Sequence, residues 1–258
     1  MPATVYGIEK YLGSGLVKGI GPLFKKDKLH VLKGIDFEIE EGQCIGLIGE
    51  SGSGKSTLSR LILGLEKPNE GSITIEGKSV KSWIKENPGK MTVVFQDYTS
   101  SANPKFTIKQ VIAEPLVALR QTENLDNVVV ELLEKVGLSA NLIHRYPHEL
   151  SGGQLQRVCI ARAIATKPKI LVLDEAISAL DVSIQAQVLD LLKDLKKELD
   201  MTYLFIAHDL QAVANLCDEV LFLYQGNIVE KISSDRLAFA ENEYAQRLLN
   251  SVIPFKIS

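Results

Sequence analysis

The stretch GESGSGKST at residues 49–57 combines glycines, hydroxyls and a lysine at the spacing of a phosphate-binding loop. It fits the pattern G-x-x-x-x-G-K-[ST], whose glycines let successive backbone N–H groups converge on phosphate oxygens. A helical pattern follows directly, and a helix N-terminus favours an anion. We therefore expect Lys55 to contact the β and γ phosphates of a nucleotide and Ser56 to supply a hydroxyl to magnesium. The residues predicted to contact the nucleotide here are Gly49, Glu50, Ser51, Gly52, Ser53, Gly54, Lys55, Ser56 and Thr57.

Two adjacent carboxylates, Asp174 and Glu175, end the apolar run in ILVLDEA at 170–176. Open α/β sheets bind ligands at the carboxyl ends of their strands, which places this pair beside a bound nucleotide. We expect Asp174 to hold magnesium and Glu175 to act as general base toward the attacking water. Alone, such a pair is more typical of a helix cap or a solvated turn. Together with the phosphate-binding loop, it favours a catalytic and magnesium-binding role.

The segment LSGGQ at 150–154 places a hydroxyl and two glycines just before a helix. The first amides of a helix lack intrahelical partners, so Ser151, Gly152 and Gly153 offer a second anion site. Because one triphosphate already occupies the loop at 49–57, the economical hypothesis is that this site completes the nucleotide pocket of another subunit. An ordinary N-cap by Ser151 is the alternative, and the spacing leaves it equally open.

Short apolar runs rich in β-branched residues alternate with helical patterns along the chain. Several runs lack polar alternation, which is typical of central strands in a parallel sheet covered on both faces. Residues 184–199 place their apolar side chains on one helical face, as a helix packed on a sheet would. This succession predicts an α/β fold. The predicted strands are CIGLIG (44–49), MTVVF (91–95), ILVLD (170–174), YLFIA (203–207) and EVLFLY (219–224).

Other segments predict additions to this core. A hairpin is expected about Gly226 and Asn227, and an antiparallel strand within 30–42. Residues 107–144 carry two helical patterns with no strand between them, which predicts an inserted helical subdomain. The last twenty or so residues are expected to form a small helical tail.

Composition limits the class of protein. The chain has 258 residues, 45% of them hydrophobic, which suits one large globular domain. A formal net charge of −3 lacks the basic character usual in nucleic-acid-binding proteins. The three cysteines, Cys44, Cys159 and Cys217, are far apart among apolar neighbours, which predicts buried thiols. No signal pattern is visible, and no apolar run approaches the roughly 18 residues of a membrane span, so we expect a cytosolic chain that reaches a membrane through a partner.

Four motifs, GESGSGKST, LSGGQ, ILVLDEA and HD at 208–209, stand in the order seen in ATP-binding cassette (ABC) ATPases, which the chain resembles over roughly 30–235. The resemblance implies ATP and Mg²⁺ as cofactors. It also implies a P-loop NTPase core with a mainly parallel sheet, an antiparallel β subdomain on the N-terminal side and an inserted helical subdomain. The expected divisions are a nucleotide-binding core at 1–96 and 165–235, a helical subdomain at 97–164 and a tail at 236–258.

The same resemblance implies roles for single residues. Ser151, Gly152, Gly153 and Gln154 would reach the γ-phosphate held by the opposite subunit of a head-to-tail dimer. Gln96 would contact magnesium and water and report to the helical subdomain, and Asp181 would line the dimer seam. His208 would hold the γ-phosphate and the attacking water, although a lone histidine after the strand YLFIA is more typical of a structural role.

Two positions depart from the family pattern. Ala176 stands where these ATPases usually have proline, which implies a less rigid turn without loss of a catalytic group. An aromatic residue that stacks on adenine normally precedes the first strand, and the region GPLFKKDKLHV does not match it cleanly. Phe24 is the candidate for this contact and Tyr11 the reserve.

Within the family, FQDYTSSANP and RYPHELSGGQLQRVCIARAI resemble the bacterial importers of dipeptides, oligopeptides and nickel, and most of all the second ATPase subunit of nickel-type systems. Longer members of this branch carry a cysteine-rich extension with an iron–sulfur cluster, which we do not expect here. The implied partners are a second, non-identical ATPase subunit, two membrane-spanning permeases and an external solute-binding protein, with no nucleic acid. The chain would sit peripherally on the cytoplasmic face of the bacterial inner membrane, with the cargo open among nickel, a metal chelate and a short peptide.

Rival classes are a DNA-repair or chromosome ATPase, a ribosome-associated ABC protein and an ABC exporter. The first would carry long coiled coils or DNA-contacting domains, and the second would carry two cassettes in one chain. A single GKST motif is present. Only the branch resemblance disfavours an exporter.

Overall fold

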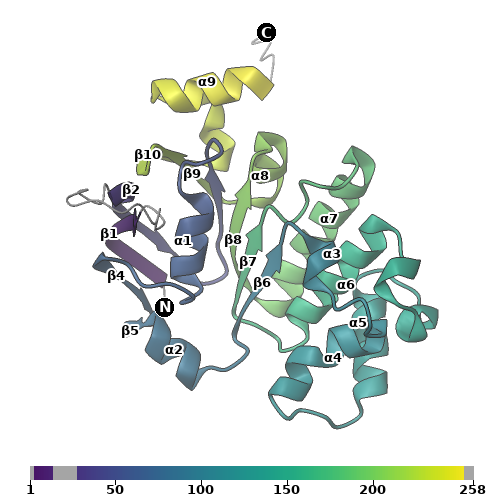
Figure 1. Ribbon diagram of the computed structural model, residues 1–258. Helices are drawn as coiled ribbons and strands as arrows, with labels where there is room; N and C mark the ends of the chain where they lie inside the picture. Colours follow the sequence, from purple (N-terminus) through teal and green to yellow (C-terminus); the bar gives the residue numbers. More distant parts are fainter. Residues whose placement is uncertain (1–2, 14–27, 253–258) are drawn as a thin grey trace, which may run out of the picture.

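The computed structural model describes residues 3–13 and 28–252. A six-stranded sheet forms the centre, in the order β10-β9-β3-β8-β7-β6 (Figure 1). All neighbouring pairs are parallel except the β9–β10 hairpin. The predicted strands and the hairpin are therefore confirmed. Their bounds are β3 Cys44–Ile48, β6 Met91–Phe95, β7 Ile170–Asp174, β8 Thr202–Ala207, β9 Glu219–Tyr224 and β10 Asn227–Ser233.

Both faces of this sheet are buried at its central strands, which explains why those strands show no polar alternation. In β3, Ile45 and Leu47 belong to a core shared with α1 (Lys55–Ile62) and the antiparallel sheet. Cys44 and Ile48 point the other way, into a core shared with α6 (Gly152–Ile164), α7 (Val182–Leu199) and α8 (Leu210–Leu216). Successive side chains of a strand alternate between faces, so the central strands β3, β7 and β8 are apolar on both faces.

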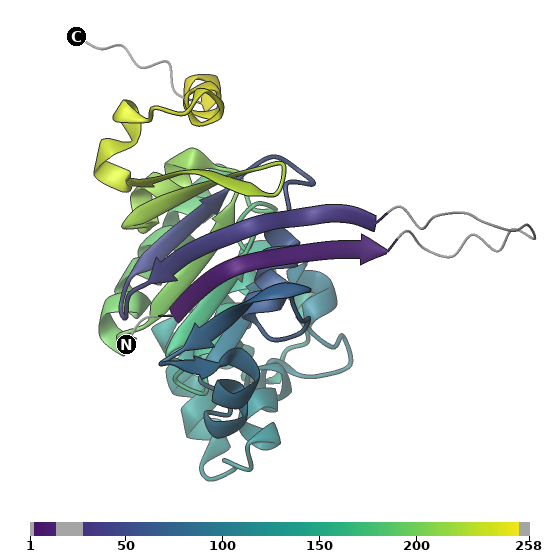
Figure 2. The same ribbon diagram turned by 90° about the vertical axis from the view of Figure 1, so that its left-hand side faces the viewer.

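A second, four-stranded antiparallel sheet has the order β2-β1-β4-β5. Figure 2 shows β2, β1 and β4 side by side. The strand predicted within 30–42 is present as part of β2, whereas the sequence did not reveal β1 and β4. The helix α2 (Val80–Glu86) follows this sheet and buries Trp83 completely. The strands are β1 Ala3–Gly13, β2 Lys28–Ile39, β4 Glu70–Ile75 and β5 Lys78–Ser79.

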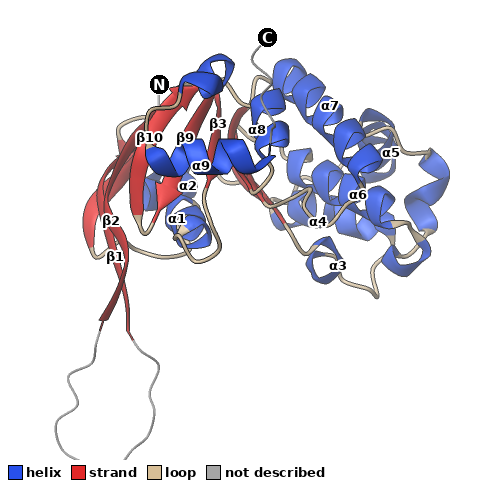
Figure 3. Cartoon of the chain, turned by 90° about the horizontal axis from the view of Figure 1, so that it is seen from above, coloured by secondary structure: helices blue, strands red, loops and turns tan. Residues whose placement is uncertain are grey.

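Helices between β6 and β7 form a separate group. Figure 3 shows α4, α5 and α6 on the side of the molecule opposite β1 and β2. Both predicted helical patterns within 107–144 are present, as α4 and α5, and the subdomain divisions at 97 and 164 stay a prediction. The elements are α3 Tyr98–Ser101, α4 Ile108–Ala118, α5 Leu125–Lys135, the 3-10 turns η1 Ala140–His144 and η2 Pro147–Glu149, and α6.

The described part of the chain ends in helical structure, as the sequence predicted, with the 3-10 turn η3 (Ser234–Phe239) and α9 (Glu243–Val252). Tyr244 is buried on the inner side of α9. The three cysteines are free and buried, as the sequence predicted. None of the helices in the described part of the chain has the length and apolar character needed to cross a membrane.

Candidate functional site

The phosphate-binding loop joins β3 to α1 and lies close to the strands on either side. Gly54 is the N-cap of α1 with φ +113°, and a Cβ there would lie 2.7 Å from Cδ2 of Leu32 in β2. A Cβ on Gly49 would lie 2.2 Å from the carbonyl oxygen of Leu223 in β9. The glycines therefore let the loop pass between β2 and β9, where a side chain would displace it.

Lys55 lies inside the curl of this loop and is only 4% exposed. Its Nζ donates to the carbonyl oxygens of Gly49 at 2.6 Å and Glu50 at 2.9 Å. Burial lowers the pKa of Lys55, and the nearby carboxylates of Glu175 and Asp174 offset only part of this effect. The loop therefore holds an ammonium group at the place where the sequence predicts phosphates.

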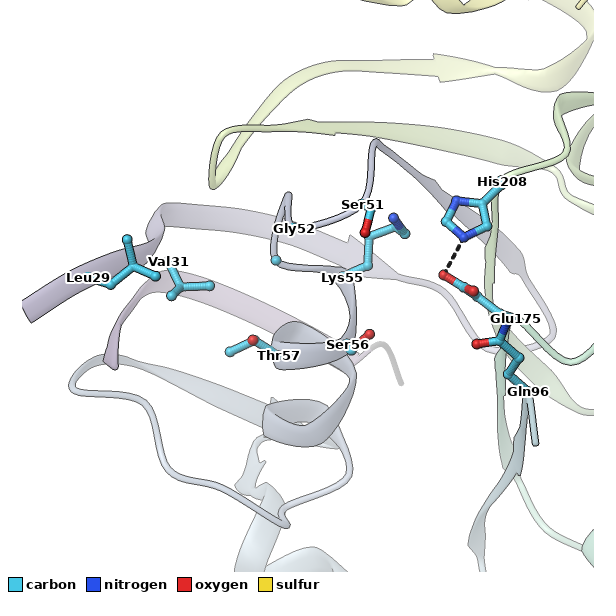
Figure 4. A pocket seen from close by; sticks show the side chains of 11 residues that line it. Leu29, Val31, Ser51, Gly52, Lys55, Ser56, Thr57, Gln96, Glu175 and His208 are labelled. Atoms are coloured by element: carbon cyan, nitrogen blue, oxygen red, sulfur yellow. Dashed lines mark ion pairs between the residues drawn. The ribbon is translucent and has the colours of Figure 1, made fainter. Parts of the chain in front are cut away.

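Glu175 and His208 meet on the opposite wall of the pocket, because β7 and β8 are adjacent parallel strands that end at the same edge. Nε2 of His208 lies 2.7 Å from Oε1 of Glu175, whose side chain is 14% exposed (Figure 4). The Glu175 backbone has φ +53° and its N–H donates to the Ile206 carbonyl at 2.9 Å. Gln156 Nε2 also donates to the carbonyl of Ala176 and so restrains the turn at the position where ABC ATPases usually have proline.

Asp174 ends β7 beside this pair and is partly buried. Burial raises the pKa of Asp174, the Glu175 charge raises it further, and the Lys55 charge lowers it. A partly buried carboxylate of this kind gains from a nearby cation. Asp174 is not among the described residues that line the pocket below, and its role toward magnesium stays a prediction.

A pocket of about 590 Å³ lies between the phosphate-binding loop and the Glu175–His208 pair, and its size is typical of small-molecule sites. Gln96, directly after β6, completes the wall on the Glu175 side (Figure 4). The pocket also has an aliphatic end, because alternate residues of β2, Leu29 and Val31, face it. The described residues that line the pocket are Leu29, Val31, Ser51, Gly52, Gly54, Lys55, Ser56, Thr57, Gln96, Glu175 and His208.

The aliphatic end was not foreseen from the sequence, although period-two alternation in KLHVLKG could have paired Leu29 with Val31. Phe24, predicted to contact adenine, lies outside the described residues. Tyr11 lies in β1, and its side chain is also outside the described part of the chain. Leu29 is 66% exposed, so it offers an apolar surface to a ligand.

The segment 150–154 contributes none of the described residues that line this pocket, and Asp181 contributes none either. Ser151 caps α6 in a reciprocal pair: its Oγ accepts from Gln154 N at 3.3 Å, and Gln154 Oε1 accepts from Ser151 N at 3.0 Å. Asp181 is the N-cap of α7. The capping role of Ser151 is thus present within one chain, and Ser151 itself remains exposed.

The two signature glycines also have packing roles. A Cβ on Gly152 would lie 2.7 Å from the Tyr98 hydroxyl, and one on Gly153 would lie 2.8 Å from Cγ2 of Ile184. Both glycines therefore let α3 and α7 approach the start of α6 closely.

The chain is similar in sequence to known transport proteins. The ABC transporter family profile matches residues 32–178. The chain is 42% identical over 236 residues to the metal-staphylopine import system ATP-binding protein CntF of Staphylococcus aureus (strain NCTC 8325 / PS 47), covering 90% of this chain and 94% of the relative. It is 44% identical over 238 residues to the oligopeptide transport ATP-binding protein OppF of Haemophilus influenzae, covering 88% and 71%. Identity to the nickel import ATP-binding protein NikE of Rhodospirillum rubrum is 40% over 230 residues, covering 87% and 83%.

Solved structures share the fold. The cbiO1 protein from Clostridium perfringens, part of the ABC transporter complex cbiONQ, aligns with a TM-score of 0.78 at 28% identity over 98% of this chain and 95% of that chain. The dimeric ATP-binding cassette MJ0796 in a post-hydrolysis state bound to ADP and Pi aligns with a TM-score of 0.76 at 27% identity over 90% and 98%. With its motif order, its nucleotide-sized pocket and these relatives, the chain belongs to the ABC transporter family, as an ATP-hydrolysing subunit.

Proposed function

We propose that this chain hydrolyses Mg²⁺·ATP in the pocket between the loop at 49–57 and the Glu175–His208 pair, and that hydrolysis powers a bacterial importer. The observation that supports this most strongly is the approach of His208 to Glu175 at 2.7 Å, across the pocket from Lys55 and Ser56. This arrangement places a candidate base opposite a phosphate cradle, with space for a triphosphate between them.

In the proposed reaction, Glu175 accepts a proton from the attacking water, whose oxygen forms a bond to the γ-phosphorus. The bond from the γ-phosphorus to the β–γ bridging oxygen breaks, which yields ADP and inorganic phosphate. His208 holds the Glu175 carboxylate and contacts the γ-phosphate. Lys55 exchanges its carbonyl partners for the β and γ phosphates, where its charge stabilises the transferred group.

Oxygen donors that suit magnesium lie on both sides of this pocket. Mg²⁺ prefers oxygen ligands and in phosphate sites commonly takes only one or two carboxylates from the protein. The Ser56 hydroxyl, the Gln96 amide oxygen and the partly buried Asp174 carboxylate supply such donors, and they would hold the ion. When bound, magnesium neutralises charge on the β and γ phosphates.

A second ATPase subunit completes the site in this proposal. Ser151, Gly152, Gly153 and Gln154 would contact the γ-phosphate held by the opposite subunit, and Asp181 would line the seam. Two observations support this: the segment lies apart from the chain's own pocket, and MJ0796 is dimeric in its ADP- and phosphate-bound state. Ser151→Arg is expected to preserve ATP binding by the isolated chain and to reduce hydrolysis in the assembled complex. Equal hydrolysis would contradict the trans role.

The proposed system imports nickel, a metal chelate or a short peptide, as the names of the relatives suggest. The chain would act with two permeases and an external solute-binding protein, bound peripherally to the cytoplasmic face of the bacterial inner membrane. The helical subdomain at 97–164, joined to the pocket through Gln96, would pass the motion of the dimer to a permease.

The test of catalysis is Glu175→Gln, which keeps the shape of the side chain and removes the base. We expect ATP binding to persist while turnover falls by about 10²- to 10⁴-fold. Glu86→Gln in α2 is the matched control, because it makes the same change far from the pocket, and it should leave turnover unchanged. Normal turnover in Glu175→Gln would remove this residue from the proposed role.

The test of cargo is uptake in a strain that lacks this chain. Radiolabelled nickel, a nickel chelate and a labelled dipeptide are supplied in parallel, and the wild-type chain or Glu175→Gln is restored from a plasmid. We expect one cargo to accumulate with the wild-type chain only. If the deletion changes the uptake of none of them, the importer assignment is wrong, whatever the ATPase result.

A further inference from the structure

A tyrosine from the C-terminal tail contacts the phosphate-binding loop. The hydroxyl of Tyr244 in α9 accepts a hydrogen bond from the backbone N–H of Glu50 at 2.9 Å, although 194 residues separate the two. Tyr244 is 3% exposed, and its ring stacks on Tyr224 at the end of β9, with centroids 4.3 Å apart. The tail is thereby linked to the pocket through one backbone amide.

That amide belongs to the peptide between Gly49 and Glu50, whose other end contacts Lys55. The carbonyl oxygen of Gly49 accepts from Lys55 Nζ at 2.6 Å, while the N–H of Glu50 points to Tyr244. A peptide group is planar, so an N–H held on one side fixes the direction of the carbonyl on the other. Tyr244 and Lys55 therefore form hydrogen bonds with opposite edges of the same peptide group.

We propose that Tyr244 is a positioning residue for nucleotide binding: its hydroxyl holds the Gly49–Glu50 peptide in the orientation that keeps Lys55 within the loop. This inference rests on the proposed function, because it takes the loop as the ATP phosphate site. Without the hydroxyl, the peptide plane gains rotational freedom, and nucleotide binding must then restrict it. ATP affinity falls as a result, while chemistry at saturating ATP still depends on Glu175.

The hydroxyl is separable from the packing of the ring. Stacking on Tyr224 and burial against the core hold the ring, and neither needs the oxygen atom. Burial raises the pKa of Tyr244, so the group stays a neutral hydroxyl at ordinary pH. Tyr224 supplies a matched comparison, because it belongs to the same stack while its hydroxyl accepts from Gln225 Nε2 at 3.0 Å.

The experiment compares Tyr244→Phe with Tyr224→Phe in the full-length chain. The dissociation constant of Mg²⁺·ATP is measured by calorimetry, kcat and KM are measured in the complex assembled with its permeases, and the melting temperature is recorded without nucleotide. Loss of one hydrogen bond predicts a rise of roughly two- to tenfold in the dissociation constant and in KM for Tyr244→Phe, with kcat unchanged. Tyr224→Phe is expected to bind ATP as the wild-type chain does.

Wild-type ATP affinity in Tyr244→Phe would overturn the proposal, whether or not the melting temperature falls, because it would leave the hydroxyl a purely structural group. Equal weakening in Tyr244→Phe and Tyr224→Phe would also overturn it, since the stack and not the amide contact would then matter. Lys55→Ala separates this inference from the proposed function. If Lys55→Ala hydrolyses ATP as fast as the wild-type chain, the loop is not the ATP site and the function itself fails.

Discussion

Substitution of Gly49 tests whether the phosphate-binding loop needs its close packing against β9. Gly49→Ala would place a Cβ 2.2 Å from the Leu223 carbonyl oxygen and 2.7 Å from Ser53 Oγ, both closer than real Cβ atoms come. The carbonyl belongs to β9 of the central sheet and cannot easily move, so the loop must leave its present position. Overpacking of this kind costs about 1–3 kcal/mol.

For a chain of this size, such a cost lowers the melting temperature by roughly 2–12 °C, at about 2–4 °C per kcal/mol. The same shift moves the loop amides away from the phosphates, and a loss of about 1.4 kcal/mol in binding weakens ATP affinity tenfold. Thermal unfolding without nucleotide and calorimetric titration with Mg²⁺·ATP measure the two effects separately.

Gly77→Ala is the control, because Gly77 lies in the turn between β4 and β5 with φ +74° and no atom within 4 Å of the added Cβ. It bears only the strain of a positive φ, about 1 kcal/mol, and should leave ATP affinity at the wild-type value. Wild-type affinity and stability in Gly49→Ala would refute the packing argument. Equal loss of ATP affinity in both variants would refute the claim that the effect is local.

Three further predictions concern capping, acid titration and thiol reactivity. Ser151→Ala removes the N-cap of α6 and is expected to cost about 1 kcal/mol, seen as a melting temperature lower by roughly 2–4 °C, with unchanged ATP affinity of the isolated chain. Hydrogen bonds from Thr99 and the Ser100 backbone lower the pKa of Asp97 from 3.8 to about 2. These bonds therefore stabilise the fold above pH 4 and are lost as the pH falls toward 2, and an NMR titration in Thr99→Val should give a higher midpoint. Burial raises the pKa of Cys159 to about 11, so iodoacetamide at pH 8 should modify this thiol only after unfolding, and rapid labelling of the folded chain would contradict its burial.

The strands that the sequence predicted well are those buried on both faces. The run CIGLIG at 44–49 is β3 almost to the residue, because α1 and the antiparallel sheet cover one face and α6–α8 the other. By contrast, ATVYGIEKYLG in β1 mixes charges with apolar residues and contains Gly7. It forms a strand because β2 and β4 flank it, with irregular register at several points. Such pairing depends on distant segments, which local patterns do not encode.

In the site, too, local sequence patterns predicted some features, while others depend on contacts between distant segments. Glu175 and His208 could be placed near the loop because each follows an apolar strand, and parallel strands bring their carboxyl ends to one edge. That they touch each other depends on β7 and β8 being neighbours, which no motif states. The contact of Tyr244 could not be predicted from the sequence, because its partner is a backbone amide and any residue except proline at position 50 could supply one.

We propose above all that LSGGQ of one subunit completes the nucleotide site of the other. The most direct measurement is a structure of the assembled complex with Glu175→Gln and Mg²⁺·ATP bound. We expect the Ser151 hydroxyl and the Gly152 and Gly153 amides to lie within about 3.2 Å of γ-phosphate oxygens held by the opposite subunit. An ATP-loaded complex in which residues 151–153 contact no triphosphate would contradict it.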